Sequence, residues 1–179
     1  MDSERIILGS GKLYCMQFTG EIPEDTVIET EENQLAHIKG GATLEYKSEI
    51  YTVEDDLALV KKSALTSEEA TLKAGLLTWC GKTLKKLCST ARITETKTKR
   101  TVKIGGIKNQ TKEKYLLRFL HEDKEDGNVR VTIVGKNEGG FSFSFAKDTE
   151  STLEPEFKAH PMDKEGTLII FEEDIIEEV

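Results

Sequence analysis

The stretch GGFSFSFAKD alternates strictly between aromatic and small polar side chains, and this alternation limits what the chain can fold into. Successive side chains of a β-strand point to opposite faces of a sheet. Phe141, Phe143 and Phe145 would therefore form an apolar face, and Ser142 and Ser144 a polar one. We predict a strand here, with its Phe face packed against a second sheet.

The same period of two recurs along most of the chain and predicts seven to nine strands. Within one of them, Val129, Val131 and Ile133 are expected to point inward, and Arg130 and Thr132 outward. The sequence contains no internal repeat of fixed period. The predicted strands occupy residues 12–18, 40–46, 72–79, 91–106, 114–123, 129–134, 139–148, 153–161 and 166–174.

One short helix is predicted over residues 82–90, KTLKKLCST. Leu84, Leu87 and Cys88 stand three and four positions apart and share one face of such a helix. A helix of about two turns is not stable alone, so this face must dock on a sheet. Trp79, the single tryptophan, lies beside the helix and is expected to fill the core beneath Leu84 and Leu87.

Two neighbouring segments fit more than one structure. Residues 47–66, KSEIYTVEDDLALVKKSALT, form either a short helix or part of a long hairpin-like loop. Thr66 and Glu69 have the spacing of a helix capping box. The apolar residues that follow alternate, however, and this favours a strand from Leu72 to Trp79.

These patterns together predict a single domain over residues 1–179. Its class is all-β, a sandwich or barrel with one short flanking helix. A long loop is expected at about residues 47–66, and an acidic tail at about residues 172–179.

Charge and cysteine content narrow the class of function. The net charge of −8 and the isoelectric point near 5.1 argue against a nucleic-acid-binding surface, which needs a basic stripe. Cys15, Cys80 and Cys88 are odd in number, lack the spacing of a metal site and are expected to be free, mostly buried thiols in a reducing compartment. The sequence has neither a signal pattern nor an apolar run long enough for a bilayer, so we expect a cytosolic protein.

No residue pattern indicates catalysis. LGSGK, residues 8–12, lacks the spacing and the hydroxyl residue of a phosphate-binding loop. HEDKED, residues 121–126, offers metal ligands, but a solvated hairpin tip explains it better, and His37 and His160 add no second motif. We therefore predict an assembly or binding module without a cofactor, a metal or enzymatic activity.

Residues 93–103 have the composition of a strand but no apolar face over most of their length. Thr94, Thr96 and Thr98 alternate there with charged side chains. Such a strand belongs on a wet surface, paired with neighbours. A basic run overlaps it, formed by Lys97, Lys99, Arg100 and Lys103.

Four segments together resemble the tail tube proteins of tailed bacteriophages of Gram-positive hosts, which are related in fold to the tube proteins of contractile injection systems. The resemblance covers most of the chain and is strongest from Trp79 to Ile93 and near the C-terminus. The segments are LGSGKLYCMQFTGEIPED, IKGGATLEYKSE, GLLTWCGKTLKKLCSTARI and EFKAHPMDKEGTLIIFEED.

The resemblance implies a structural subunit that forms hexameric rings stacked into a hollow tube. Such a tube holds the tape measure protein and then conducts DNA without binding it specifically. Its other partners are the tail terminator and the baseplate or tip proteins, with a sheath protein in contractile tails. The implied location is the virion tail, after assembly in the bacterial cytoplasm.

The same resemblance implies roles for particular residues. The 47–66 segment matches an arm that reaches the adjacent ring, with contacts expected at Tyr51, Asp55, Asp56, Leu57, Leu59 and Val60. The barrel wall of the tube is expected to include Thr94, Thr96, Thr98, Arg130, Thr132, Ser142 and Ser144. Helix-to-core packing is expected of Trp79, Leu84, Leu87 and Cys88.

Three other interpretations stay open beside this one. The chain fits a tube subunit of a contractile, tail-like particle. It also fits a monomeric β-sandwich binding module. A metal enzyme that uses residues 121–126 fits least well.

Overall fold

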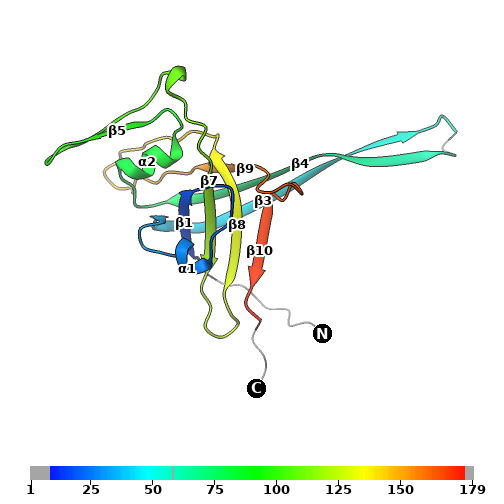
Figure 1. Ribbon diagram of the computed structural model, residues 1–179, viewed down its shortest axis with the longest axis horizontal. Coiled ribbons are helices and arrows are strands. Elements are labelled where there is room, and N and C mark those ends of the chain that lie inside the picture. Colours follow the sequence, from blue (N-terminus) through cyan, green and yellow to red (C-terminus); the bar gives the residue numbers. More distant parts are fainter. Residues whose placement is uncertain (1–8, 58, 176–179) are drawn as a thin grey trace.

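The computed structural model describes residues 9–57 and 59–175. This part of the chain forms an antiparallel sheet of eight strands, a separate two-stranded sheet and two short α-helices, and the prediction of an all-β fold is confirmed (Figure 1). The elements are β1 (Lys12–Gln17), α1 (Asp25–Ile28), β2 (Gln34–Ala36), β3 (Ile38–Glu54), β4 (Lys61–Leu76), α2 (Gly81–Leu87), β5 (Arg92–Glu95), β6 (Arg100–Lys103), the 3-10 helix η1 (Ile107–Asn109), β7 (Tyr115–His121), β8 (Val129–Asn137), β9 (Glu156–Ala159) and β10 (Ile169–Glu173).

The eight-stranded sheet folds over itself at β8. The strand order is β2-β1-β7-β8-β9-β4-β3, and β10 also pairs with β8. The first half of β8 pairs with β10, whereas its end pairs with β9, so the sheet divides along this strand. As a result β1, β7, β8 and β10 stand across the long ribbon of β3 and β4 (Figure 1).

Gly135 lies where β8 changes its partner. It pairs with Ala159 of β9, and a Cβ atom built on it would lie 2.1 Å from the carbonyl oxygen of Lys158. A larger residue would push β9 away from β8. Glycine is therefore required by the close approach of two backbones.

The core lies between the two halves of the folded sheet. Leu72 and Leu76 of β4 belong to one buried cluster with Leu117 of β7 and Ile133 of β8. Phe157 of β9 is fully buried in the same cluster. Burial of these side chains is the main source of stability for the body.

A smaller apolar cluster covers the opposite face of β1 and β7. Ile28 of α1 is buried there with Tyr14, Leu116 and Leu120. The periodicity of the sequence did not predict α1, because its four residues are too few to establish a helical period.

Residues 47–66 form a β-hairpin, which agrees with the hairpin-like alternative, and the short-helix alternative is wrong. They are the distal halves of β3 and β4, whose pairing continues to Glu54 and Lys61. Gly40 and Gly41, expected to open a strand, instead form a bulge inside β3, with φ near 79° at both. This left-handed backbone explains why glycine occupies both positions.

The strand predicted over residues 139–148 is wrong. The chain leaves the sheet after Asn137 and runs as an irregular loop until β9. Both edges of β8 are already occupied by β7, β9 and β10, so the segment that follows cannot pair there. Phe143 and Phe145 are exposed and do not pack the core.

The polar segment predicted as one strand, residues 91–106, is a β-hairpin. β5 and β6 pair with each other in the two-stranded sheet and turn between them. The backbone N–H of Lys99 donates to Thr96 Oγ1, which stabilises the turn. The basic run is therefore divided between the turn and β6.

Candidate assembly surface

The distal arm, which we define as residues 50–65, reaches away from the core (Figure 1). β3 and β4 pair only with each other there. Ile50 and Leu65 lie opposite each other on one face and are 66 % and 53 % exposed. Tyr51 and Val53 lie on the other face and are 63 % and 52 % exposed. A two-stranded ribbon has no layer of its own to cover such side chains, which is typical of a contact surface.

Asp55 orders the turn at the tip of the arm. Its Oδ1 accepts hydrogen bonds from the backbone N–H groups of Leu59 and Val60, at 2.6 and 2.8 Å. These bonds, led by the one from Val60, hold the pKa of the Asp55 carboxyl below its usual value. The turn presents Leu57, Leu59 and Val60 to solvent.

The base of the arm is fixed to the body. Lys158 of β9 pairs with Glu69 Oε2 at 3.1 Å. The Tyr46 hydroxyl donates to Glu68 across the ribbon. These contacts give the arm a defined direction where it leaves the sheet.

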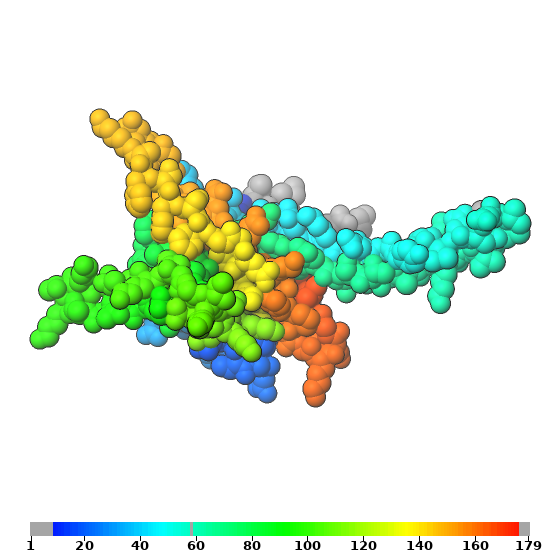
Figure 2. Space-filling model, turned by 90° about the horizontal axis from the view of Figure 1, so that it is seen from above, coloured from blue at the N-terminus to red at the C-terminus, as the bar shows by residue number. Residues whose placement is uncertain are grey.

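All the residues expected to make contacts from the arm lie close together on it. Tyr51 is near the end of β3. The other five residues lie in the turn between β3 and β4; they are Asp55, Asp56, Leu57, Leu59 and Val60. Figure 2 shows this end of the ribbon projecting far beyond the body. Asp55 has a structural role in the turn, so the apolar members are the ones available for contact.

The residues expected in the wall of a tube are not brought together within one chain. Thr94 lies in β5, and Thr96 and Thr98 lie between β5 and β6. Ser142 and Ser144 lie in the exposed loop after β8. These five residues belong to a hairpin and a loop outside the main sheet.

Arg130 and Thr132, expected to point outward into water, are covered by other elements. Thr132 is fully buried and accepts a hydrogen bond from Arg118 Nε at 2.9 Å. Arg130 Nε donates to Glu29 Oε1 at 2.8 Å. The expectation was wrong because α1 packs over this face and β10, the neighbouring strand, adds Glu172 to it; alternation within β8 reveals neither.

Arg118 is the centre of a buried ionic network that sequence reasoning missed. Its side chain is 2 % exposed. The guanidinium contacts Asp25, Glu29 Oε1 at 3.4 Å and Glu172 Oε2 at 3.0 Å. It thus joins α1 and β10 to β7 with charge-assisted hydrogen bonds. The available signal was an arginine at the centre of an otherwise apolar strand.

The predicted helix exists as α2 and ends at Leu87. Leu84 and Leu87 are buried in the core, while Cys88 after the helix is half-buried. Trp79 is also half-buried and packs against the same cluster. Its Nε1 donates to the carbonyl oxygen of Ser151 at 3.2 Å.

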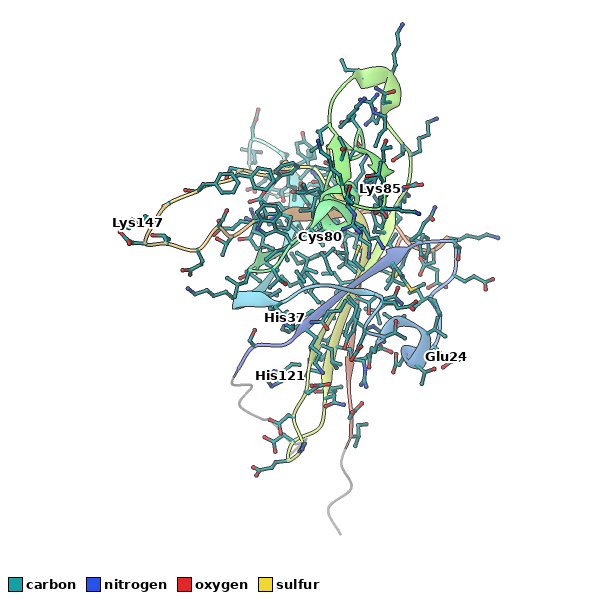
Figure 3. All side chains as sticks on the ribbon, turned by 90° about the vertical axis from the view of Figure 1, so that its left-hand side faces the viewer. Glu24, His37, Cys80, Lys85, His121 and Lys147 are labelled. Atoms are coloured by element: carbon teal, nitrogen blue, oxygen red, sulfur yellow. The ribbon has the colours of Figure 1, made fainter. Side chains whose placement is uncertain are left out.

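Trp79 begins a ladder of aromatic rings along the loop after β8. The Phe143 ring centroid lies 4.8 Å from that of Trp79. Phe141 and Phe145 lie 5.1 and 5.9 Å from Phe143. The ladder fastens the loop to the body. Phe145 is 81 % exposed, and Lys147 lies on the projecting part of the loop (Figure 3).

The acidic run at residues 121–126 has a local structural role. His121 Nδ1 lies 2.9 Å from the carbonyl oxygen of Ser10. Asp123 Oδ1 accepts hydrogen bonds from the backbone N–H groups of Glu125 and Asp126. Among residues 9–57 and 59–175, no group of three or more His, Cys, Asp or Glu side chains is arranged to hold a metal ion.

The three cysteines are free thiols in different environments. Burial raises the pKa of the Cys15 thiol to about 12. Cys80 is exposed at the start of α2. Its partial burial opposes ionisation, but hydrogen bonds from the backbone at Thr83 and Lys82 outweigh this and lower the pKa of the thiol. Cys80 is therefore more readily ionised than Cys15.

No model of a known protein family matches this chain, and no curated protein is similar to it in sequence. Within the part of the chain that the structure describes, none of the helices has the length and apolar character needed to cross a membrane.

Proposed function

We propose that this chain is a structural subunit that assembles with copies of itself into hexameric rings, and that the rings stack into a hollow tail tube of the bacteriophage type. The tube would hold a tape measure protein and then conduct DNA. Terminator and baseplate or tip proteins would close its ends. A contractile particle with a sheath would use the same subunit. The proposal combines the sequence resemblance with the geometry of the distal arm.

The distal arm is the observation that supports this function best. Ile50 and Leu65 on one face, and Tyr51 and Val53 on the other, leave apolar surface uncovered on both sides of the ribbon. Burial of apolar area is the main favourable contribution to most protein–protein association. Insertion of the arm between subunits of an adjacent ring would cover both faces at once.

A monomeric β-sandwich binding module is the second candidate. Its support is the body of the molecule, in which one chain buries Leu72, Leu117, Ile133 and Phe157 without a partner. The distal arm would then contact an unlike protein and not another copy.

Shortening the arm tests the proposed function. Replacing residues 50–66 with Asn-Gly joins the paired residues Glu49 and Ser67 through a two-residue hairpin turn. Every described residue in the removed segment is exposed, so the body should fold normally. We expect the wild-type chain to sediment as stacked assemblies and the shortened variant to stop at single rings or smaller species.

The matched control is Lys62→Ala, which removes an exposed polar side chain of the same arm and leaves its apolar faces intact. This control should stack like the wild type. Stacking by the shortened variant to the wild-type extent would contradict a role for the arm in assembly.

A further inference from the structure

The charges of this chain are strongly segregated. Residues 81–114, which we call the basic lobe, contain eleven Lys or Arg and two Asp or Glu, a net charge of +9. The rest of the chain contains 14 basic and 31 acidic residues, a net charge of −17. The lobe comprises α2, β5, β6 and η1, which lie together at one end of the body (Figure 1). The overall charge of −8 conceals a basic surface on an acidic molecule.

Most of this basic charge is not neutralised within the subunit. Among the described residues, Arg100 is the one member of the lobe in an ion pair, with Glu95 Oε1 at 2.6 Å. Lys86 Nζ donates to the carbonyl oxygen of Cys15 at 2.6 Å. Lys82 and Lys85 are exposed on α2. A surface with this density of one charge favours an acidic partner.

The basic lobe contains a groove of about 430 Å³ beside α2 and β5. Lys82, Lys85 and Lys86 line it, together with the two glutamates of the lobe. Ile93 and Tyr115 add apolar surface. This combination fits a protein segment that presents carboxylates next to an apolar side chain.

The same chain offers such a segment at residues 19–36, which we call the acidic segment. It contains six Asp or Glu and no Lys or Arg. Asp25 pairs with the buried Arg118, and Glu29 with the partly buried Arg130, inside the subunit. Val27 lies between them and is 50 % exposed. The remaining carboxylates are exposed and form no ion pair among the described residues; they are Glu21, Glu24, Glu31 and Glu32.

α2 of the basic lobe and α1 of the acidic segment pack on opposite faces of the β1–β7 pair, whereas Leu35 and Ala36 at the end of the acidic segment belong to the same cluster as Leu84. Leu84 of α2 belongs to the cluster that contains Leu13, whereas Ile28 of α1 belongs to the cluster that contains Tyr14. Adjacent residues of β1 point to opposite faces of the sheet. Figure 3 shows Lys85 and Glu24 on separate elements at the surface.

We propose that the basic lobe of one copy binds the acidic segment of the next copy, with Lys82 and Lys85 placed against Glu21 and Glu24. Two different surfaces then meet, so the contact is head-to-tail and closes into a ring or continues as a filament. The acidic residues of the arm fit less well, because Glu54 already pairs with Lys61 of the same subunit and Asp55 accepts hydrogen bonds within the turn. The inference rests on the self-assembly in the proposed function, but it uses surfaces separate from the distal arm.

Two charge-reversed variants of the full chain test this contact. One carries K82E and K85E, and the other carries E21K and E24K. Each variant alone should associate at least about tenfold more weakly than the wild type in sedimentation velocity, because like charges now meet. An equimolar mixture should recover association, because each lobe then finds a segment of opposite charge. A control with K124E and K164E makes the same change of net charge at exposed turns away from the lobe and should behave like the wild type.

Two further measurements test whether the acidic segment of another copy is what binds the basic lobe. Association of the wild type should weaken about tenfold between about 0.05 M and about 0.5 M salt, because partly exposed charges are screened. A zero-length carbodiimide should link Lys82 or Lys85 of one isotope-labelled copy to Glu21 or Glu24 of another. A fluorescent double-stranded oligonucleotide serves as the competing ligand for the lobe.

The inference and the proposed function fail in different ways. Rings and tubes that form equally well in both charge-reversed variants would overturn the contact and leave the function standing. Intersubunit cross-links with recovery in the mixture, but only open chains and no rings or tubes, would support the contact and contradict the function. Tight oligonucleotide binding that K82E and K85E abolish, without any change in self-association, would show that nucleic acid occupies the lobe and overturn the proposal.

Discussion

Among single residues, Arg118 contributes most to holding separate elements together. It is buried beneath α1, where its guanidinium contacts Asp25 and Glu29 of the α1 region and Glu172 of β10. Arg118→Ala removes the partner of these carboxylates and leaves a cavity. We expect the free energy of unfolding to fall by about 3 kcal/mol, the lower end for a broken buried pair, because Asp25 and Glu172 also reach solvent.

Urea unfolding followed by the fluorescence of Trp79, the single tryptophan, measures this change. Arg118→Met fills most of the volume and should cost less than Arg118→Ala. Lys124→Ala, at an exposed turn, should change stability by less than about 0.5 kcal/mol. A loss of stability in Arg118→Ala no larger than in Lys124→Ala would show that the network does not hold the fold.

The residues of β8 show which part of a strand is predictable from its alternation. Val129 and Ile133 are buried, as their apolar character predicts. Thr132 was assigned to a wet face because it is polar, yet it is fully buried beneath Arg118. Alternation correctly separates the two faces of a strand. It cannot state whether a second layer covers the polar face, because that layer comes from α1, far away in the sequence.

Among the elements, the distal arm is the one with least support from its own chain. Residues 50–65 pair only as a two-stranded ribbon, so their hydrogen bonds should open easily in an isolated subunit. Hydrogen–deuterium exchange of the unassembled chain should be fast there and slow at Leu117 and Ile133 in the core. Assembly should slow exchange in the arm by at least about tenfold if copies cover it.

The core strands β7 and β8 are the internal reference for that experiment, because their exchange should not depend on assembly. An arm that exchanges equally fast in isolated and assembled chains would contradict its burial between subunits.

Helical spacing and strand alternation differ in how reliably they predict secondary structure in this chain. The spacing of Leu84 and Leu87 correctly predicts α2, because a helix forms its hydrogen bonds within one segment. The alternation of Phe141, Phe143 and Phe145 fails to predict structure, because a strand also needs a free neighbouring edge. The edges of β8 are taken, and Phe143 packs at a tilt against Trp79 instead.

For the whole molecule, the candidate assembly surfaces divide between two kinds of interaction. The distal arm presents apolar side chains on both faces of a ribbon, whereas the basic lobe and the acidic segment carry opposite charges, with α2 and α1 on opposite faces of the β1–β7 pair. The net charge of −8 alone would indicate a uniformly acidic protein. The fold separates the charges, because the 81–114 segment packs as one unit beside the core.

The central claim is that this chain completes its structure by associating with copies of itself into a closed, hollow assembly. Negative-stain electron microscopy of the purified full chain, over a range of concentrations in low salt, tests it most directly. We predict rings with a central lumen, which stack into tubes as the concentration rises. A uniform population of compact single subunits at every concentration would contradict the claim.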